Sequence, residues 1–136
     1  MILKIITVDY DQTATSCFKY ILNDIAKFKW ISHAYSSREA KELIKLQKPD
    51  VVIIDIELKE ENGFELLKFI KRTHPGVAVF MLSNTTDFNL AKKSKLLGAH
   101  YLIDKSLEFY NIPNFLMALQ SAKNISQTLN QFESFT

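Results

Sequence analysis

Three carboxylates stand directly after short apolar runs of the sequence. Asp9 and Asp11 follow the first run, and Asp55 closes the run Val51-Val52-Ile53-Ile54. A continuous apolar run of this kind predicts a strand buried on both faces of a sheet. A carboxylate carried by such a strand needs a partner, because an unpaired buried charge is costly. Carboxylates brought together favour a hard divalent cation such as Mg²⁺, which takes oxygen ligands and keeps several waters.

A hydroxyl and an ammonium group follow two later apolar runs. Ser83 comes after the run 77–82, and Lys105 comes shortly after the run 100–103. Both groups suit a phosphoryl group, because each can donate a hydrogen bond to its oxygens. Together with a metal ion and with Asp55 as the nucleophile, they would form a clamp for phosphoryl transfer.

The apolar runs alternate with segments of helical spacing, such as 13–28 and 88–97. Ser36 and Glu39 have the spacing of a capping box, and Gly98 is placed to end a helix. Strands alternating with helices predict an α/β fold, a doubly wound five-stranded parallel sheet of the flavodoxin-like (βα)5 kind. The carboxyl ends of its strands meet at one edge, so the polar groups above are expected to lie together. The candidate strands cover 3–8, 30–35, 51–55, 77–82 and 100–103.

Composition and charge limit the other possibilities. The chain has 136 residues and a net charge of +2, which favours one domain and neither nucleic acid nor an anionic membrane as a partner. We expect the domain to cover 1–122, and 123–136 to extend the last helix or form a tail. No apolar run approaches the ~20 residues of a membrane span. The single cysteine, Cys17, excludes an intramolecular disulfide, so we expect a cytoplasmic protein, with Cys17 facing the core.

The order and spacing of these residues resemble a response-regulator receiver domain, the phospho-accepting module of two-component signalling. Asp55 is followed by Asn62-Gly63 at the spacing typical of receivers, and Ser83 lies 22 residues before Lys105, as in that family. The segment from Gly98 leads to Lys105 much as the usual glycine-alanine segment leads to the receiver lysine. The likeness covers about residues 3–122.

The resemblance implies a role for each candidate residue. Asp55 would accept a phosphoryl group from a histidine kinase or a phosphotransfer protein. Mg²⁺ would be held by Asp9, by the side chain of Asp55 and by the backbone carbonyl of Glu57. Lys105 would bind one phosphoryl oxygen, and Ser83 would hydrogen-bond another after transfer. That new bond would draw the loop after the fourth strand inward and change the face that a downstream protein reads.

Among the positions that depart from the family's pattern, two lie at the site itself. Tyr10 replaces the second member of the acidic pair, which is usually the direct metal ligand, so Mg²⁺ affinity is open. Asn84 replaces the small residue that usually follows the switch hydroxyl. Three roles stay open at the acidic position: Asp11 reaches into the site, Asp9 takes the direct role, or Asp11 only caps the chain.

Two functions therefore compete, neither of them enzymatic. One is a stand-alone receiver that is phosphorylated on Asp55 and signals through a protein partner. The other is a pseudo-receiver, an interaction module that works without phosphorylation; a different small α/β enzyme is a third reading. A homodimer through the last helix is also expected as one possibility, against a tail folded on its own domain. Its basis is an apolar stripe at spacings of three and four, made of Phe115, Ala118, Ala122, Ile125, Leu129 and Phe132.

Overall fold

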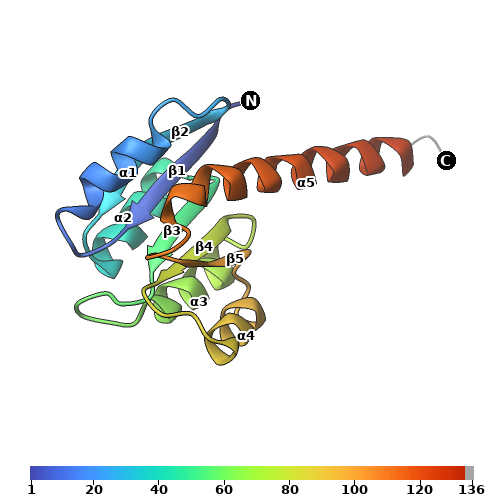
Figure 1. Ribbon diagram of the computed structural model, residues 1–136. Helices are drawn as coiled ribbons and strands as arrows, with labels where there is room; N and C mark the ends of the chain where they lie inside the picture. The colour runs from blue at the N-terminus through green and yellow to red at the C-terminus, as the bar shows by residue number, and fades with distance from the viewer. Residues whose placement is uncertain (134–136) are drawn as a thin grey trace.

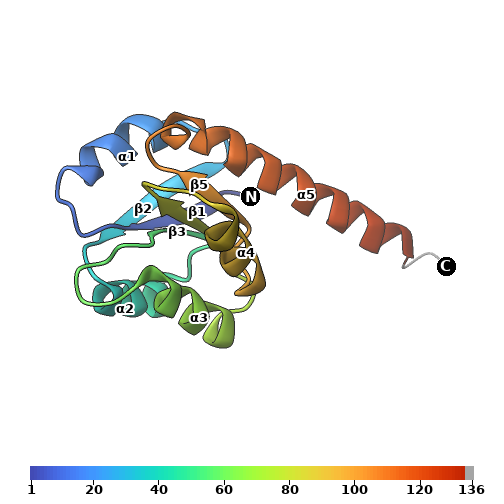
Figure 2. The same ribbon diagram turned by 60° about the horizontal axis from the view of Figure 1, so that its bottom comes forward.

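The computed structural model describes the backbone of residues 1–133 and the side chains of residues 1–124 and 129. Five parallel strands form one sheet in the order β2-β1-β3-β4-β5, with helices on both faces (Figures 1 and 2). The predicted doubly wound α/β fold is confirmed. The strands are β1 (Leu3–Val8), β2 (Phe28–Ala34), β3 (Val51–Asp55), β4 (Ala78–Ser83) and β5 (Tyr101–Asp104). The helices are α1 (Ala14–Leu22), α2 (Ser37–Gln47), α3 (Gly63–Thr73), α4 (Phe88–Leu96), the short 3₁₀ helix η1 (Phe109–Asn111) and α5 (Ile112–Glu133).

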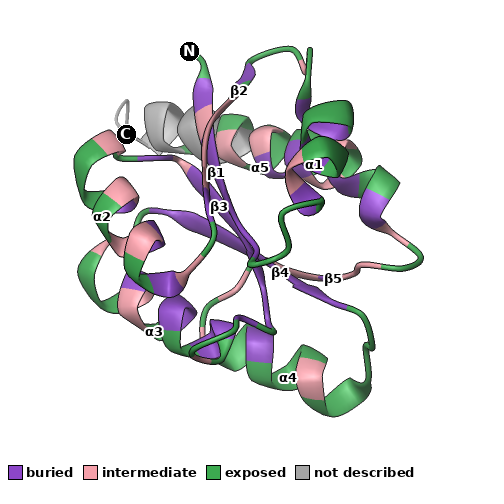
Figure 3. Cartoon of the chain, turned by 90° about the vertical axis from the view of Figure 1, so that its left-hand side faces the viewer, coloured by how far each residue is buried: buried purple, intermediate pink, exposed green. Residues whose placement is uncertain are grey.

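Successive residues of the central strand pack into two separate cores. Ile53 belongs to the core that α1 and α5 cover, and Ile54 to the core that α2 and α3 cover. Every residue of β3 is buried, and Figure 3 shows the same for most of β1 and β4. A strand covered on both faces needs apolar side chains at consecutive positions, which explains the continuous run that ends at Asp55.

The capping residues act as their types predict. Ser36 accepts a hydrogen bond from the backbone N–H of Glu39 at 3.1 Å, which is one half of the predicted capping box. Gly98, just beyond α4, has a φ of 100°, a conformation that glycine adopts at the end of a helix without steric cost. Ser36 therefore marks the start of α2, the helix before β3, and Gly98 marks the end of α4, the helix before β5.

The first helix is shorter than predicted. α1 ends at Leu22 rather than at residue 28, and β2 begins at Phe28. Asp24 and Lys27 have φ values of 71° and 70°, so the connection turns through left-handed conformations that a right-handed helix cannot contain. The prediction for Cys17 was also wrong, because the residue is exposed on α1.

The last helix extends beyond the sheet toward the C-terminus (Figures 1 and 2). Its first turns are anchored in the core by Ile112, Leu116 and Leu119, whereas Leu129 is 56% exposed. The predicted boundary at 122 falls inside this continuous helix and remains a prediction. Although α5 has 22 residues, neither it nor any other helix in the described part of the chain is long and apolar enough to cross a membrane.

Candidate functional site

The ammonium group of Lys105 lies between two buried carboxylates. Its Nζ atom is 2.7 Å from Oδ2 of Asp9 and 2.6 Å from Oδ2 of Asp55. Asp9 is fully buried and Asp55 is 4% exposed, so this single cation is the shared counter-ion of two buried carboxylates. The three residues follow or end β1, β3 and β5. The carboxyl edge of the parallel sheet therefore brings them together, as the sequence predicts.

The backbone of the loop after β3 also contacts the Asp55 carboxylate. Oδ1 of Asp55 accepts a hydrogen bond from the N–H of Glu57 at 2.8 Å. The side chain of Asn62 caps α3, and the N–H of Gly63 donates to the carbonyl of Ile56 at 2.6 Å. A Cβ atom on Gly63 would lie 2.4 Å from the carbonyl oxygen of Asp55, so only glycine fits. The Asn62-Gly63 pair thus serves to start α3 in contact with the site.

Ser83 lies at the same edge, with its hydroxyl engaged in its own loop. The hydroxyl donates to the carbonyl of Thr85 at 2.5 Å. The carbonyl of Ser83 accepts the backbone N–H of Lys105 at 2.8 Å. The two residues are therefore joined through the pairing of β4 and β5, although the Ser83 hydroxyl has no hydrogen bond to Asp55 among the described residues.

After β1, the Asp11 side chain closes a local turn instead of reaching into the site. Oδ1 of Asp11 accepts the backbone N–H and the hydroxyl of Thr13 at 2.9 and 2.8 Å. These hydrogen bonds hold the pKa of Asp11 below its usual value. Tyr10 is 48% exposed. Asp11 instead contributes its backbone N–H, which donates to Oδ1 of Asp9 at 2.9 Å. Asp9 is therefore the only carboxylate from this segment that lies against Lys105.

A family match identifies the domain. Residues 5–116 match the model of the response regulator receiver domain. The chain belongs to this family. Receiver domains are the modules of two-component signalling that accept a phosphoryl group, interact with histidine kinases or phosphotransfer proteins, and generally bind Mg²⁺. The resemblance expected from Asp55, Ser83 and Lys105 is thereby confirmed at the level of the family.

Relatives of this receiver domain are longer proteins. It is 34% identical over 84 residues to protein-glutamate methylesterase/protein-glutamine glutaminase 2 of Vibrio vulnificus, covering 62% of this chain and 24% of the relative. It is 34% identical over 79 residues to the sensory transduction protein LytT of Bacillus anthracis, covering 57% of this chain and 32% of that protein. The chain therefore spans a third or less of the length of these curated relatives.

Solved receiver structures align along almost the whole chain. The response regulator domain of Thermotoga maritima CheB has a TM-score of 0.75 and 28% identity, covering 96% of this chain and 98% of that one. The isolated receiver domain of RcsB from Salmonella enterica has a TM-score of 0.81 at 19% identity, covering 89% and 90%. At 19% identity, the likeness to RcsB shows a shared fold only.

Burial and charge act in opposite directions on the receiver's central pair. Burial raises the pKa of Asp55, against the hydrogen bonds that it accepts from Lys105 and Glu57. For Lys105, burial lowers the pKa, but the hydrogen bonds to Asp55 and Asp9 outweigh it and the pKa is raised. The ion pair prevails, because the Lys105 ammonium at 2.6 Å favours the ionised form of Asp55, which is the form that can act as a nucleophile.

The oxygen donors fit Mg²⁺ with one carboxylate fewer than the family's pattern. Within the described residues no group of three or more His, Cys, Asp or Glu side chains is arranged to hold a metal ion. The carboxylates of Asp9 and Asp55 and the carbonyl of Glu57 are the oxygens that the family resemblance implies. Mg²⁺ is commonly held by one or two carboxylates with several waters. These donors suit such an ion, which would compete with the Lys105 ammonium for the Asp9 and Asp55 carboxylates.

Two polar residues beneath the site were not among the predicted site residues. Thr7 is fully buried in β1, and its hydroxyl lies 2.6 Å from Nδ1 of His33 in β2. The polar Thr7 within an otherwise apolar run was the feature of the sequence that could have revealed this pair.

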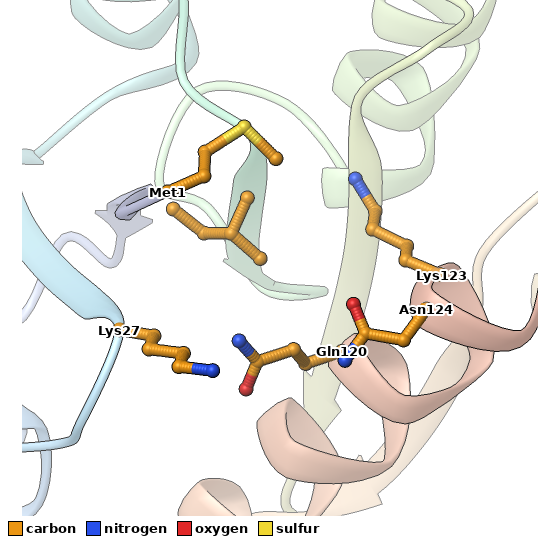
Figure 4. A pocket seen from close by; sticks show the side chains of 6 residues that line it. Met1, Lys27, Gln120, Lys123 and Asn124 are labelled. Carbon is orange, nitrogen blue, oxygen red and sulfur yellow. The ribbon is translucent and has the colours of Figure 1, made fainter. Parts of the chain in front are cut away.

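A pocket lined by Met1, Leu3, Lys27 and residues of α5 (Figure 4) is separate from the candidate site, because it lies at the amino ends of the strands.

Proposed function

We propose that this chain accepts a phosphoryl group on Asp55 and signals by a phosphorylation-dependent contact with another protein. The observation that carries the proposal is the Lys105 ammonium held 2.6 Å from the Asp55 carboxylate and 2.7 Å from Asp9. The donor would be a phosphohistidine of a histidine kinase or phosphotransfer protein. The bond between phosphorus and the histidine nitrogen breaks as a bond to an Asp55 oxygen forms, and the nitrogen keeps the electron pair.

Lys105 has the donors that this step needs. An ammonium group has three N–H bonds, and two of them are directed to Asp9 and Asp55. The third can bind an oxygen of the incoming phosphoryl group and offset its charge. Mg²⁺, held by Asp9, Asp55 and the Glu57 carbonyl, would add positive charge at the same oxygens. The weaker donor set left by Tyr10 predicts lower Mg²⁺ affinity than two adjacent acids would give.

Ser83 supplies the change that a partner could detect. Its hydroxyl donates to the carbonyl of Thr85. To donate to a phosphoryl oxygen on Asp55 it must release that carbonyl, so the loop from Asn84 to Asp87 rearranges. All four loop residues are exposed, which leaves them free to move without breaking the core. We propose that this loop and the neighbouring α4 carry the signal to a downstream protein.

Mass spectrometry tests phosphoryl acceptance. The protein is incubated with Mg²⁺ and phosphoramidate, and we expect a gain of one phosphoryl group that is absent in Asp55→Asn. Asp11→Asn is the matched control, because asparagine caps as well as aspartate and this side chain faces Thr13 rather than Lys105. An unmodified wild-type protein would contradict the proposal.

That negative result would favour the second candidate, a pseudo-receiver that binds its partner without phosphate. The specific observations for it are Tyr10 at the acidic position and Asp11 turned to Thr13. In either case we propose a non-enzymatic signalling module that works in the cytoplasm. The longer relatives support a signalling role, and any activity of their other segments is a separate matter.

We also propose that α5 pairs two copies of the chain. Leu129 is 56% exposed on the part of α5 that extends past the sheet. It belongs to the apolar stripe predicted from the sequence. The side chains of Ile125 and Phe132, also in that stripe, lie outside the described residues. Sedimentation of the chain cut after Lys123 tests the dimer, and the same number of chains per particle as in the full-length protein would contradict it.

A further inference from the structure

Asp9 is held by a hydrogen bond at each of its polar groups. Its backbone N–H donates to the carbonyl of Ala34 at 3.0 Å. Its carboxylate accepts the N–H of Asp11 at Oδ1 and the ammonium of Lys105 at Oδ2. Its backbone carbonyl lies 3.0 Å from Nε2 of His33. Two of these contacts come from side chains. Lys105 already has a role in the proposed phosphoryl transfer, whereas His33 has none.

The partners of His33 settle which ring nitrogen carries the proton. A carbonyl oxygen can only accept, so Nε2 must donate to Asp9. In the neutral ring Nδ1 is then an acceptor, and the hydroxyl of Thr7, 2.6 Å away, must donate to it. In the imidazolium form Nε2 remains a donor, so the contact with Asp9 exists in both protonation states.

Thr7 and Trp30 hold the ring in this orientation. The indole N–H of Trp30 donates to the hydroxyl oxygen of Thr7 at 3.0 Å. Because an indole nitrogen only donates, the Thr7 hydroxyl proton is left for His33. The ring also packs against Phe18 and Tyr35, with centroids 6.0 and 4.7 Å away. Hydrogen bonds and two aromatic contacts therefore fix both the tautomer and the plane of the imidazole.

We propose that His33 is a positioning residue of this receiver: through its Nε2–H it fixes the backbone of Asp9, and so the carboxylate that shares Lys105 with Asp55. The reason lies in the neighbouring positions. With Tyr10 exposed and Asp11 turned to Thr13, Asp9 is the only acid after β1 that faces Lys105. A single carboxylate has no neighbour to take over if it shifts, and small displacements of catalytic groups are costly.

The functional part of this inference rests on the proposed phosphorylation of Asp55. Phosphorylation rates are compared for His33→Leu, which removes both ring nitrogens, and His33→Gln, whose amide can place an N–H near the Nε2 position. We expect His33→Leu to be slower by about tenfold to a hundredfold, and His33→Gln to recover most of that loss. His100→Leu, a histidine just before β5 with no contact to Asp9, should react like the wild type.

Stability and rate separate positioning from a merely structural role. Both variants are assayed well below their unfolding temperatures, with the folded fraction verified by circular dichroism. If His33 only stabilised the fold, His33→Leu would melt earlier yet react at the wild-type rate, and that result would overturn the proposal. Equal losses in His33→Leu and His33→Gln would overturn it as well.

Nitrogen NMR tests the arrangement without any phosphorylation. In the neutral ring of wild-type His33 we expect a protonated Nε2 and an unprotonated Nδ1, with the Nε2 proton protected from exchange. An Nδ1–H tautomer, or rapid averaging of the two, would overturn the inference. Because this measurement needs no phosphodonor, it still decides the geometry if the wild-type protein proves not to be phosphorylated.

Discussion

Replacing Lys105 by methionine should expose the energetic cost of the buried acid pair. Lys105→Met keeps an unbranched side chain of similar length but removes the cation from Asp9 and Asp55. Breaking a buried ion pair by removing one partner costs about 3–5 kcal/mol. Lys105 itself is 22% exposed, so water can reach the edge of the site and reduce this figure. We therefore expect a loss of about 3 kcal/mol in the free energy of unfolding at pH 7.

The loss should depend on pH in a defined direction. Without the ammonium, burial and the neighbouring Asp9 charge raise the pKa of the Asp55 carboxyl group in the folded variant above its unfolded value. The folded state then binds protons more readily than the unfolded state, so acidification from pH 7 toward pH 5 stabilises the variant relative to the wild type. The deficit should shrink over this range, and Asp55→Asn added to Lys105→Met should reduce it at pH 7.

Urea unfolding followed by circular dichroism measures both quantities. Lys68→Met is the control, because Lys68 pairs with Glu65 on the exposed surface of α3 at 2.9 Å; such pairs contribute little, and we expect no measurable change. A deficit below about 1 kcal/mol at pH 7, or one that grows on acidification, would refute the account of Lys105 as the partner of both carboxylates.

Three other predictions concern the surroundings of the site. Gly63→Ala should cost about 2 kcal/mol by urea unfolding, because its Cβ would meet the Asp55 carbonyl, while Gly76→Ala, with nothing within 4 Å of its Cβ, should not; equal losses would contradict the close-approach argument. Tyr10→Asp should tighten Mg²⁺ binding measured by calorimetry, and an unchanged affinity would mean that the added carboxylate does not reach the ion. Burial and two nearby lysines lower the pKa of His100, so the folded state takes up its proton less readily than the unfolded state, and thermal stability should fall as pH drops below about 6.5. His100→Gln should make this fall shallower, and an identical pH profile would contradict the prediction.

The sequence predicted which residues meet at the site, because strand order follows from simple rules. Parallel strands end at one edge, so Asp55 and Lys105 had to lie near each other. The direction of a side chain in a loop follows no such rule. The Asp11 carboxylate turns to Thr13 because two donors lie within one turn of it, and Cys17 is exposed because other residues, Ala14, Phe18, Ile21 and Leu22, form the buried face of α1.

The buried polar network under Asp9 was the larger omission. Thr7 and His33 pair across two strands, and their hydrogen bond depends on a register that no local pattern in the sequence specifies. Their bonds could be assigned only once β1 and β2 were aligned. The two hydrogen bonds of Lys105 also depend on tertiary structure, because its ammonium contacts carboxylates that lie 96 and 50 residues away in the sequence.

The indole of Trp30 gives the molecule an internal optical probe. It is the chain's only tryptophan, and its N–H is the first donor in a series that runs through Thr7 and His33 to the backbone of Asp9. Any event that shifts Asp9 alters the polarity that this indole senses. The emission of the unlabelled protein should therefore report metal binding or phosphoryl transfer in real time, without a dye or an engineered residue.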